Sequence, residues 1–210
     1  MGGQAPRGTL ILDFDSTLIT RESLEVLLAR ARPDLADEIR GITAAGMEGR
    51  IPFRESLEKR LALARPTRAE VEALGREALT WITPGMEGGW GAWQLWLVSG
   101  GLAEALLPVA ARLKIPRERV LATEARWSED GELLGIEARD KPEQLRAHLV
   151  AMPRPRVLVG DGITDWEPFR DGLVDHFIAF TANVRRASVL AKGAPEAPSA
   201  AALRFILASC

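Results

Sequence analysis

The sequence has very few of the side chains that bind transition metals or form disulfides. Its single cysteine, Cys210, excludes an internal disulfide and a cysteine-based zinc site. Its two histidines, His148 and His176, are far apart in the chain, which excludes a histidine-rich metal site as well. Any metal must therefore be held by carboxylate oxygens, a donor set that favours magnesium.

The sequence also lacks a large net charge and a long apolar run. Its 27 basic and 29 acidic residues give a net charge of −2, which argues against a nucleic-acid or membrane-surface role based on bulk charge. No stretch approaches the roughly 18 apolar residues of a membrane helix, and residues 1–8 lack the apolar run of a signal peptide. We therefore expect a soluble cytoplasmic protein, in which 47% hydrophobic residues suffice for a core.

Short apolar runs alternate with helical patterns along most of the chain. Runs without polar alternation are typical of strands buried on both faces of a parallel sheet. Such runs lie at 9–12, 94–98, 156–159 and 177–180. The expected helices are 102–113, 142–151, 184–192 and 200–208, and a hairpin is expected at 120–127 and 132–137. This alternation predicts an α/β fold with a Rossmann-like, doubly wound, mostly parallel sheet.

A helical region follows the first strand directly. Residues 20–81 contain no strand-like segment, and Thr67 and Glu70 form a capping box that begins one of its helices. We therefore expect a small helical cap domain, residues 18–82, inserted into a discontinuous core of residues 1–17 and 83–210.

Polar side chains follow three of the predicted strands directly. Asp13 and Asp15 come after the first strand, residues 99–101 after the second, and Asp161 and Asp165 after the third. Ligands of an open α/β sheet bind at the carboxyl ends of its strands, where these groups would meet. Clustered carboxylates are costly to bury unless a divalent cation is present, and nearby hydroxyl and glycine positions suit a phosphate. Any one Asp could be a turn former, but three such sites in order predict a magnesium-dependent phosphoryl-transfer site.

Four motifs, in the order in which they occur, resemble those of the haloacid-dehalogenase superfamily of phosphatases. Residues 13–18 (DFDSTL) resemble the first motif, and residues 97–101 (LVSGG) resemble the second. Lys141 resembles the lysine of the third motif, and residues 160–165 (GDGITD) resemble the acidic fourth motif. The resemblance spans nearly the whole chain.

The resemblance implies a catalytic role for several residues at this edge. Asp13 is expected to be the nucleophile, which forms an aspartyl-phosphate. Asp15 is expected to act first as general acid and then as general base. Ser99, the backbone amide of Gly100 and Lys141 are expected to bind the phosphate oxygens.

The resemblance also implies a magnesium site. Asp13 and Asp161 would supply side-chain oxygens, and Asp15 would supply its backbone carbonyl. Asp165 would hold a metal-bound water or orient Lys141.

Within this superfamily, the inserted region resembles the cap of the phosphoserine phosphatases. The matching positions are Glu22, 47–49 (MEG), Phe53, 56–57 (SL), Arg60, 177–180 (FIAF) and 183–186 (NVRR). The cap is expected to close over the substrate, with its hinge at residues 18–20 and 82–84.

Arg60 is the most informative position in the cap. It lies about 20° from Phe53 on the helix, on or beside the apolar stripe, where an arginine needs an anionic partner. The carboxylate of phosphoserine would be such a partner, with Glu22 facing the substrate ammonium; alternatively, the Arg60 side chain crosses the core surface to solvent. Met47 and Phe53 would line the pocket or belong to the core. Thr164, where many bacterial members have asparagine, would offer a hydroxyl to the substrate.

The leading functional hypothesis is hydrolysis of O-phospho-L-serine to L-serine and phosphate. It implies Mg²⁺ as cofactor, a small-molecule partner, no nucleic acid or membrane partner, and a monomer or homodimer. A phosphatase or phosphotransferase acting on another small phosphomonoester remains an alternative, as do a phospho-accepting signalling protein and a non-catalytic binding protein. Signalling receivers, however, are about half this length and lack a helical insertion.

The segment before the second predicted strand departs from the family pattern. Residues 84–93 are shorter than the helix expected there and poor in helix-forming residues. We therefore expect a truncated outer helix, with tryptophans covering the sheet surface that it exposes.

Overall fold

The computed structural model describes residues 5–47 and 50–210, and it confirms the predicted α/β fold. One sheet has the strand order β4-β3-β2-β1-β5-β6-β7. All neighbouring pairs are parallel except β3 and β4, which form the predicted antiparallel hairpin. The strands are β1 Gly8–Asp13, β2 Trp93–Leu102, β3 Val120–Trp127, β4 Leu133–Glu137, β5 Arg156–Gly160, β6 His176–Phe180 and β7 Glu196–Ala197.

Helices cover both faces of this sheet, as a doubly wound fold requires. The helices are α1 Ser23–Ala31, α2 Ala36–Met47, α3 Phe53–Ala64, α4 Arg68–Ala78, α5 Ala103–Arg112, α6 Lys141–Arg146, α7 Ile163–Arg170, α8 Ala187–Leu190 and α9 Ala200–Ala208. Short 3₁₀ turns lie at Pro33–Leu35, Leu79–Trp81, Arg117–Arg119 and Leu149–Ala151. In the described ranges, no helix is long and apolar enough to cross a membrane.

The central strand β1 shows why its sequence is a continuous apolar run. Leu10 and Leu12 point to one face of the sheet, where they join a cluster that includes residues of α4, α5 and α9. Ile11 points to the other face, where it packs with residues of α6 and α8. Each residue of β1 is buried, because successive side chains of a strand alternate between two covered faces.

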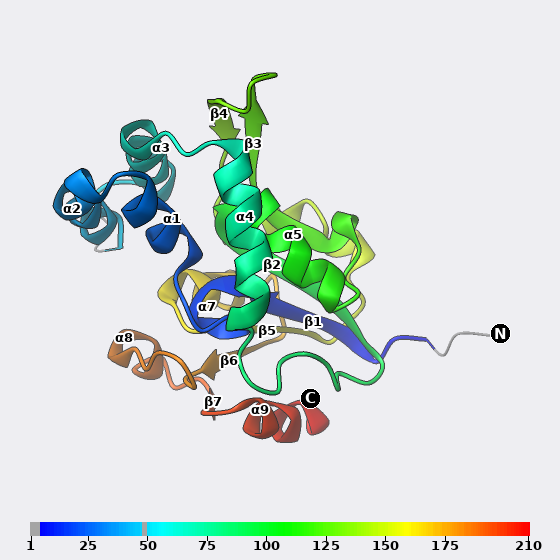
Figure 1. Cartoon of the computed structure of the whole chain (residues 1–210). Coiled ribbons are helices and arrows are strands. Elements are labelled where there is room, and N and C mark those ends of the chain that lie inside the picture. The colour runs from blue at the N-terminus through cyan, green and yellow to red at the C-terminus, as the bar shows by residue number, and fades with distance from the viewer. Residues whose placement is uncertain (1–4, 48–49) are drawn as a thin grey trace.

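The region between β1 and β2 is helical, as predicted, and the capping box of Thr67 and Glu70 is present. Its two connections to the sheet lie side by side, since Ile19 and Ile82 form an isolated β-bridge. Helices α1–α3 gather beyond the carboxyl end of β1, whereas α4 lies along α5 (Figure 1). The contact between α4 and α5 is tight, because a Cβ at Gly75 would lie 2.8 Å from the Glu104 carbonyl oxygen.

Several predicted element bounds were wrong. The helix expected at 142–151 ends at Arg146. There the His148 ring contacts the Gln144 carbonyl, which in a longer helix would accept a hydrogen bond from the backbone amide of residue 148. The helix expected at 184–192 is reduced to α8, since residues 184–186 are irregular and Arg186, just before α8, has an extended backbone. The expected loose stretch 193–199 contains β7, and α7 has no counterpart among the predicted elements.

Residues 84–92 form turns without a helix, as the composition of this segment predicts. Met86 and Trp90 are buried in the core cluster on this face of the sheet. The Arg204 guanidinium of α9 lies 5.2 Å from the Trp90 ring centroid and donates to the Gly85 carbonyl at 2.6 Å. Trp90 therefore covers the sheet where an outer helix is missing.

Candidate active site

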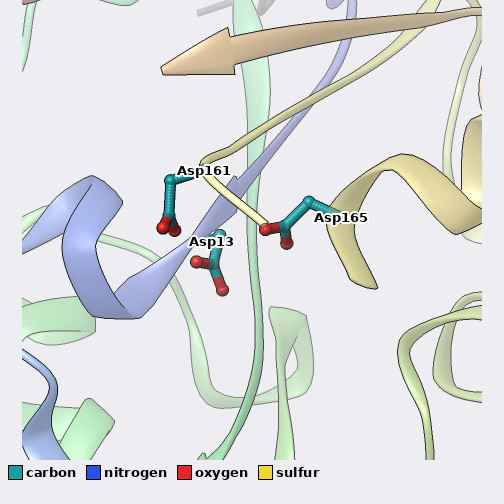
Figure 2. A group of neighbouring side chains, drawn as sticks. All are labelled: Asp13, Asp161 and Asp165. Carbon is teal, nitrogen blue, oxygen red and sulfur yellow. The ribbon is translucent and has the colours of Figure 1, made fainter. Parts of the chain in front are cut away.

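Three buried carboxylates meet where the sequence predicts them. Asp13 ends β1, Asp161 follows β5, and Asp165 lies in the first turn of α7 (Figure 2). One carboxylate oxygen from each lies within 4.8 Å of the other two. These hard oxygen donors fit Mg²⁺, and the cation would offset their mutual repulsion.

Lys141 contributes a positive charge to this cluster. Its Nζ donates to Asp13 Oδ1 at 2.5 Å and also to Asp165 Oδ1. Burial lowers the pKa of Lys141, but the Asp13 and Asp165 carboxylates raise it more, so the ammonium form persists. The Lys141 ammonium, together with the Arg186 guanidinium that pairs with Asp161, does not balance three carboxylates, and burial together with Asp165 raises the pKa of Asp13. The cluster therefore retains an attraction for a further cation.

The backbone around Asp165 explains the glycines of the 160–165 segment. Asp165 Oδ2 accepts a hydrogen bond from the Gly162 amide at 2.9 Å. A Cβ at Gly160 would lie 2.2 Å from the Asp165 carboxyl carbon, so this position requires glycine. The Asp165 carboxylate is thereby fixed on one oxygen, while its other oxygen contacts Lys141.

Asp15 is half-buried beside this cluster, and its side chain is directed toward the start of α1. Its Oδ1 accepts from the Ser23 amide at 2.6 Å, and its Oδ2 lies 3.7 Å from the position of a Cβ at Gly101. Burial, and secondarily the charge of Glu22, raises the pKa of Asp15 to about 7. Asp15 can therefore exchange a proton near neutral pH, which is the property that general acid–base catalysis needs.

The end of β2 brings Ser99 and Gly100 to the same edge. Ser99 is buried, and its Oγ accepts from the Gly101 amide at 3.0 Å. Thr123 Oγ1 donates to the Gly100 carbonyl at 2.9 Å. Phe53 of the inserted region contacts Gly100 closely, since a Cβ there would lie 2.6 Å from its ring. The Phe53 ring thus lies over the predicted phosphate-binding loop.

Arg60 is buried in the inserted region, with its side chain 8% exposed. This burial shows that the alternative in which Arg60 reaches solvent is wrong. Nη1 donates to Glu25 Oε1 at 2.9 Å and lies 3.2 Å from Thr43 Oγ1, while Nε donates to the Ser56 carbonyl. Burial lowers the pKa of Arg60 more than Glu25 raises it. Within the described residues, Nη2 of Arg60 makes no hydrogen bond.

Glu22, the residue before α1, links the start of the inserted region to the sheet edge. Its Oε1 accepts from Ser16 Oγ at 2.7 Å and from Arg186 Nη2 at 3.2 Å. Arg186 Nε also donates to Asp161 Oδ2 at 2.6 Å, so this guanidinium joins a cluster carboxylate to Glu22.

Sequence reasoning did not assign a role to Arg186 or to Glu25. The signal for Arg186 was its membership of the 183–186 (NVRR) segment that resembles the family, whereas nothing in the local sequence of Glu25 marks it. Thr164 lies exposed in the first turn of α7. The side chain of Met47, at the end of α2, lies outside the described residues, as do residues 48 and 49.

Comparisons with known proteins agree with this arrangement. Residues 10–167 match the model of the haloacid dehalogenase-like hydrolase family. The phosphoserine phosphatase of Bos taurus is 30% identical over 190 residues, which cover 84% of this chain and 83% of that protein. The chloroplastic phosphoserine phosphatase of Arabidopsis thaliana is 29% identical over 85% of this chain, and the match spans 64% of that relative's length.

A solved structure shows the same fold at higher similarity. The phosphoserine phosphohydrolase-like protein of Francisella tularensis superposes with a TM-score of 0.83 at 32% identity, over 95% of this chain and 99% of that one. The chain therefore belongs to the haloacid dehalogenase-like hydrolase family, where its relatives are phosphoserine phosphatases, and it is an enzyme of the phosphatase type.

Proposed function

We propose that this enzyme hydrolyses O-phospho-L-serine to L-serine and phosphate through an aspartyl-phosphate on Asp13. The observation that carries the proposal is the buried cluster of Asp13, Asp161 and Asp165, with Lys141 bound to two of its members. An acidic group with a raised pKa, Asp15, lies beside it. These residues would supply a nucleophile, a proton donor and cationic groups for the phosphate at one edge of the sheet.

The residues at this edge divide the reaction into two steps. In the first, an Asp13 carboxylate oxygen attacks phosphorus, the ester P–O bond breaks, and Asp15 gives its proton to the leaving alkoxide. In the second, Asp15 takes a proton from water, which attacks the same phosphorus and releases phosphate from Asp13. Lys141 and the 99–101 loop would hold the non-bridging oxygens. When bound by Asp13, Asp161 and the Asp15 carbonyl, Mg²⁺ would neutralise charge on the nucleophile and the phosphate.

The inserted region would supply the groups that recognise an amino-acid substrate. The free Nη2 of Arg60 would bind the substrate carboxylate, and Glu22 would face its ammonium group. Phe53, which already touches Gly100, would close the pocket over the phosphoryl group. Residues 18–82 would act as the cap, and Thr164 and Met47 would complete the pocket.

Phosphate release from a panel of phosphomonoesters, with and without magnesium, tests this proposal directly. Phosphoserine should be preferred to esters that lack either the carboxylate or the ammonium group. A panel in which another small phosphomonoester is preferred would favour the alternative substrate. Adding an alcohol acceptor would detect phosphotransfer, and size-exclusion chromatography and cell fractionation would test the expected monomer or homodimer and the cytoplasmic location.

We expect activity to require magnesium and calcium to inhibit it. Calcium takes more oxygen ligands, at longer distances, than magnesium does. Asp13 held through both carboxylate oxygens would have no free oxygen for attack on phosphorus. Initial rates with each metal, alone and in competition, measure the effect, and equal rates with both metals would contradict the proposed site geometry.

The pH dependence should depend on the leaving group. Because burial and Glu22 raise the pKa of Asp15 to about 7, the acid form is lost as the pH rises through this value. We therefore expect kcat/KM for phosphoserine, whose alkoxide needs a proton, to fall above pH 7. An aryl phosphate with a good leaving group should lack this decline.

Substitution of Glu22 tests the cause of this shift. Glu22→Gln removes a charge that raises the Asp15 pKa, so the decline in kcat/KM should move to lower pH. The control Glu77→Gln, at an exposed ion pair, should leave the pH of the decline unchanged. An identical pH profile for the two substrates would count against Asp15 as the proton donor.

A further inference from the structure

Gln144 combines burial with an unsatisfied polar atom. It lies in α6, one turn after Lys141, and is 4% exposed. Among the described residues, its side-chain oxygen Oε1 is buried without a hydrogen-bond partner. Such an atom lowers the stability of the folded state, so its retention calls for an explanation.

The other end of the same side chain is fully used. Gln144 Nε2 donates to the Ser99 carbonyl at 3.3 Å and to the Arg139 carbonyl at 2.8 Å. The amide cannot be reversed, because Oε1 would then face two carbonyl oxygens. The buried, unpartnered oxygen is therefore a consequence of the two hydrogen bonds that Nε2 makes.

These two hydrogen bonds join elements that bind the phosphate. Ser99 is on β2, whereas Arg139 lies just before α6, which begins at Lys141. Asp140 caps this helix by accepting from the Glu143 amide at 2.8 Å, so the α6 N-terminus is a well-defined unit. Gln144 fastens that unit to the end of β2.

We propose that Gln144 is a positioning residue, which holds the Lys141 ammonium in register with Ser99 and Gly100 so that one phosphoryl group contacts all three. The inference rests on the proposed phosphatase function. Gln144 does not itself reach the acidic cluster, and its effect passes through Lys141 and Ser99.

The variant Gln144→Met separates this role from packing. Methionine has a similar length and is unbranched, and it removes the unpaired amide oxygen, but it also leaves the Ser99 and Arg139 carbonyls without their donor. Because these two effects on stability oppose each other, we expect a Tm close to that of the wild type, together with a kcat about tenfold lower, since displaced supporting groups cost about that much or more. Competitive inhibition by orthovanadate should weaken in parallel, and phosphoserine and an aryl phosphate should be affected alike.

Gln94, which lies on β2 together with Ser99, provides the control. Gln94 Oε1 accepts from Trp96 Nε1 at 3.0 Å, and within the described part of the chain the Gln94 side chain makes no hydrogen bond to the 99–101 loop. Gln94→Met should lower Tm, because the Trp96 N–H loses its partner, and should leave kcat per folded molecule unchanged. Gln144→Leu repeats the test with a second apolar side chain if the methionine variant does not fold.

Two outcomes would overturn the inference. A Gln144→Met enzyme with wild-type kcat and vanadate inhibition would show that Lys141 and Ser99 need no such link. A parallel loss of Tm and kcat would show that Gln144 serves packing alone. A wild-type enzyme without activity on any phosphomonoester would instead overturn the proposed function, and the positioning role with it.

Discussion

Asp13→Asn should abolish turnover while leaving the fold intact. The asparagine amide is a poor nucleophile. We therefore expect kcat to fall on the order of 10⁴-fold or more, as in other enzymes from which the catalytic nucleophile is removed. Phosphate release under saturating substrate measures this loss. A variant that retains a tenth of the wild-type rate would show that the nucleophile is another residue.

The same variant should be stable, which separates chemistry from folding. Burial and Asp165 raise the pKa of Asp13, so its ionised form costs stability at neutral pH in the absence of a metal. Asparagine removes that charge, and Tm at pH 7 without added metal should match or exceed the wild-type value. Beryllofluoride with magnesium should raise the Tm of the wild type and of the exposed control Asp130→Asn, but not that of Asp13→Asn.

The second large effect concerns substrate choice. Arg60→Ala would leave the substrate carboxylate without its partner in a buried pocket, which should cost about 2–5 kcal/mol of binding free energy. Arg60→Lys should also bind poorly, because an ammonium cannot replace the planar donor set that reaches Glu25 and the substrate together. The loss should appear with phosphoserine and vanish with an aryl phosphate that has no carboxylate.

Matched variants decide whether Arg60 selects the substrate or only stabilises the inserted region. Arg30→Ala removes an exposed arginine of the inserted region, paired with Glu77, and should leave the rates with both substrates unaffected. Glu22→Gln, compared at a pH below the Asp15 decline, should weaken only substrates with an ammonium group. If Arg60→Ala lowers the rate equally with both substrates, Arg60 supports the cap through Glu25 and does not select phosphoserine.

The residues that the sequence located correctly are those set by strand ends. A buried strand is recognisable from its apolar run, and its carboxyl end then fixes where Asp13, Ser99 and Asp161 lie. The end of the third strand likewise placed Asp165 at this edge, whereas the convergence of Lys141 on Asp13 required the motifs as well, because Lys141 does not follow a strand.

Other features depend on partners that are distant in the chain. The ion pair of Arg60 with Glu25 joins α3 to α1, and many other acidic residues of the inserted region carry the same charge. Arg186 reaches Asp161 and Glu22 only because β6 ends beside β5. The end of α6 was missed because the His148 ring replaces a backbone hydrogen bond, which helical periodicity does not report.

The close contact at Gly75 restricts how the inserted region can move. A helix whose backbone already lies against the Glu104 and Ala105 backbone cannot slide along α5 without collision. Helix α4 is held at its other end too, where the Arg68 amide donates to the Gly131 carbonyl at 2.9 Å. Arg65, in the left-handed conformation at φ 45°, and Pro66 then form the joint between α3 and α4. We therefore expect α4 to stay fixed against α5 while α1–α3 move, which places the second hinge at Arg65 and Pro66 and not at residues 82–84, where the sequence predicts it.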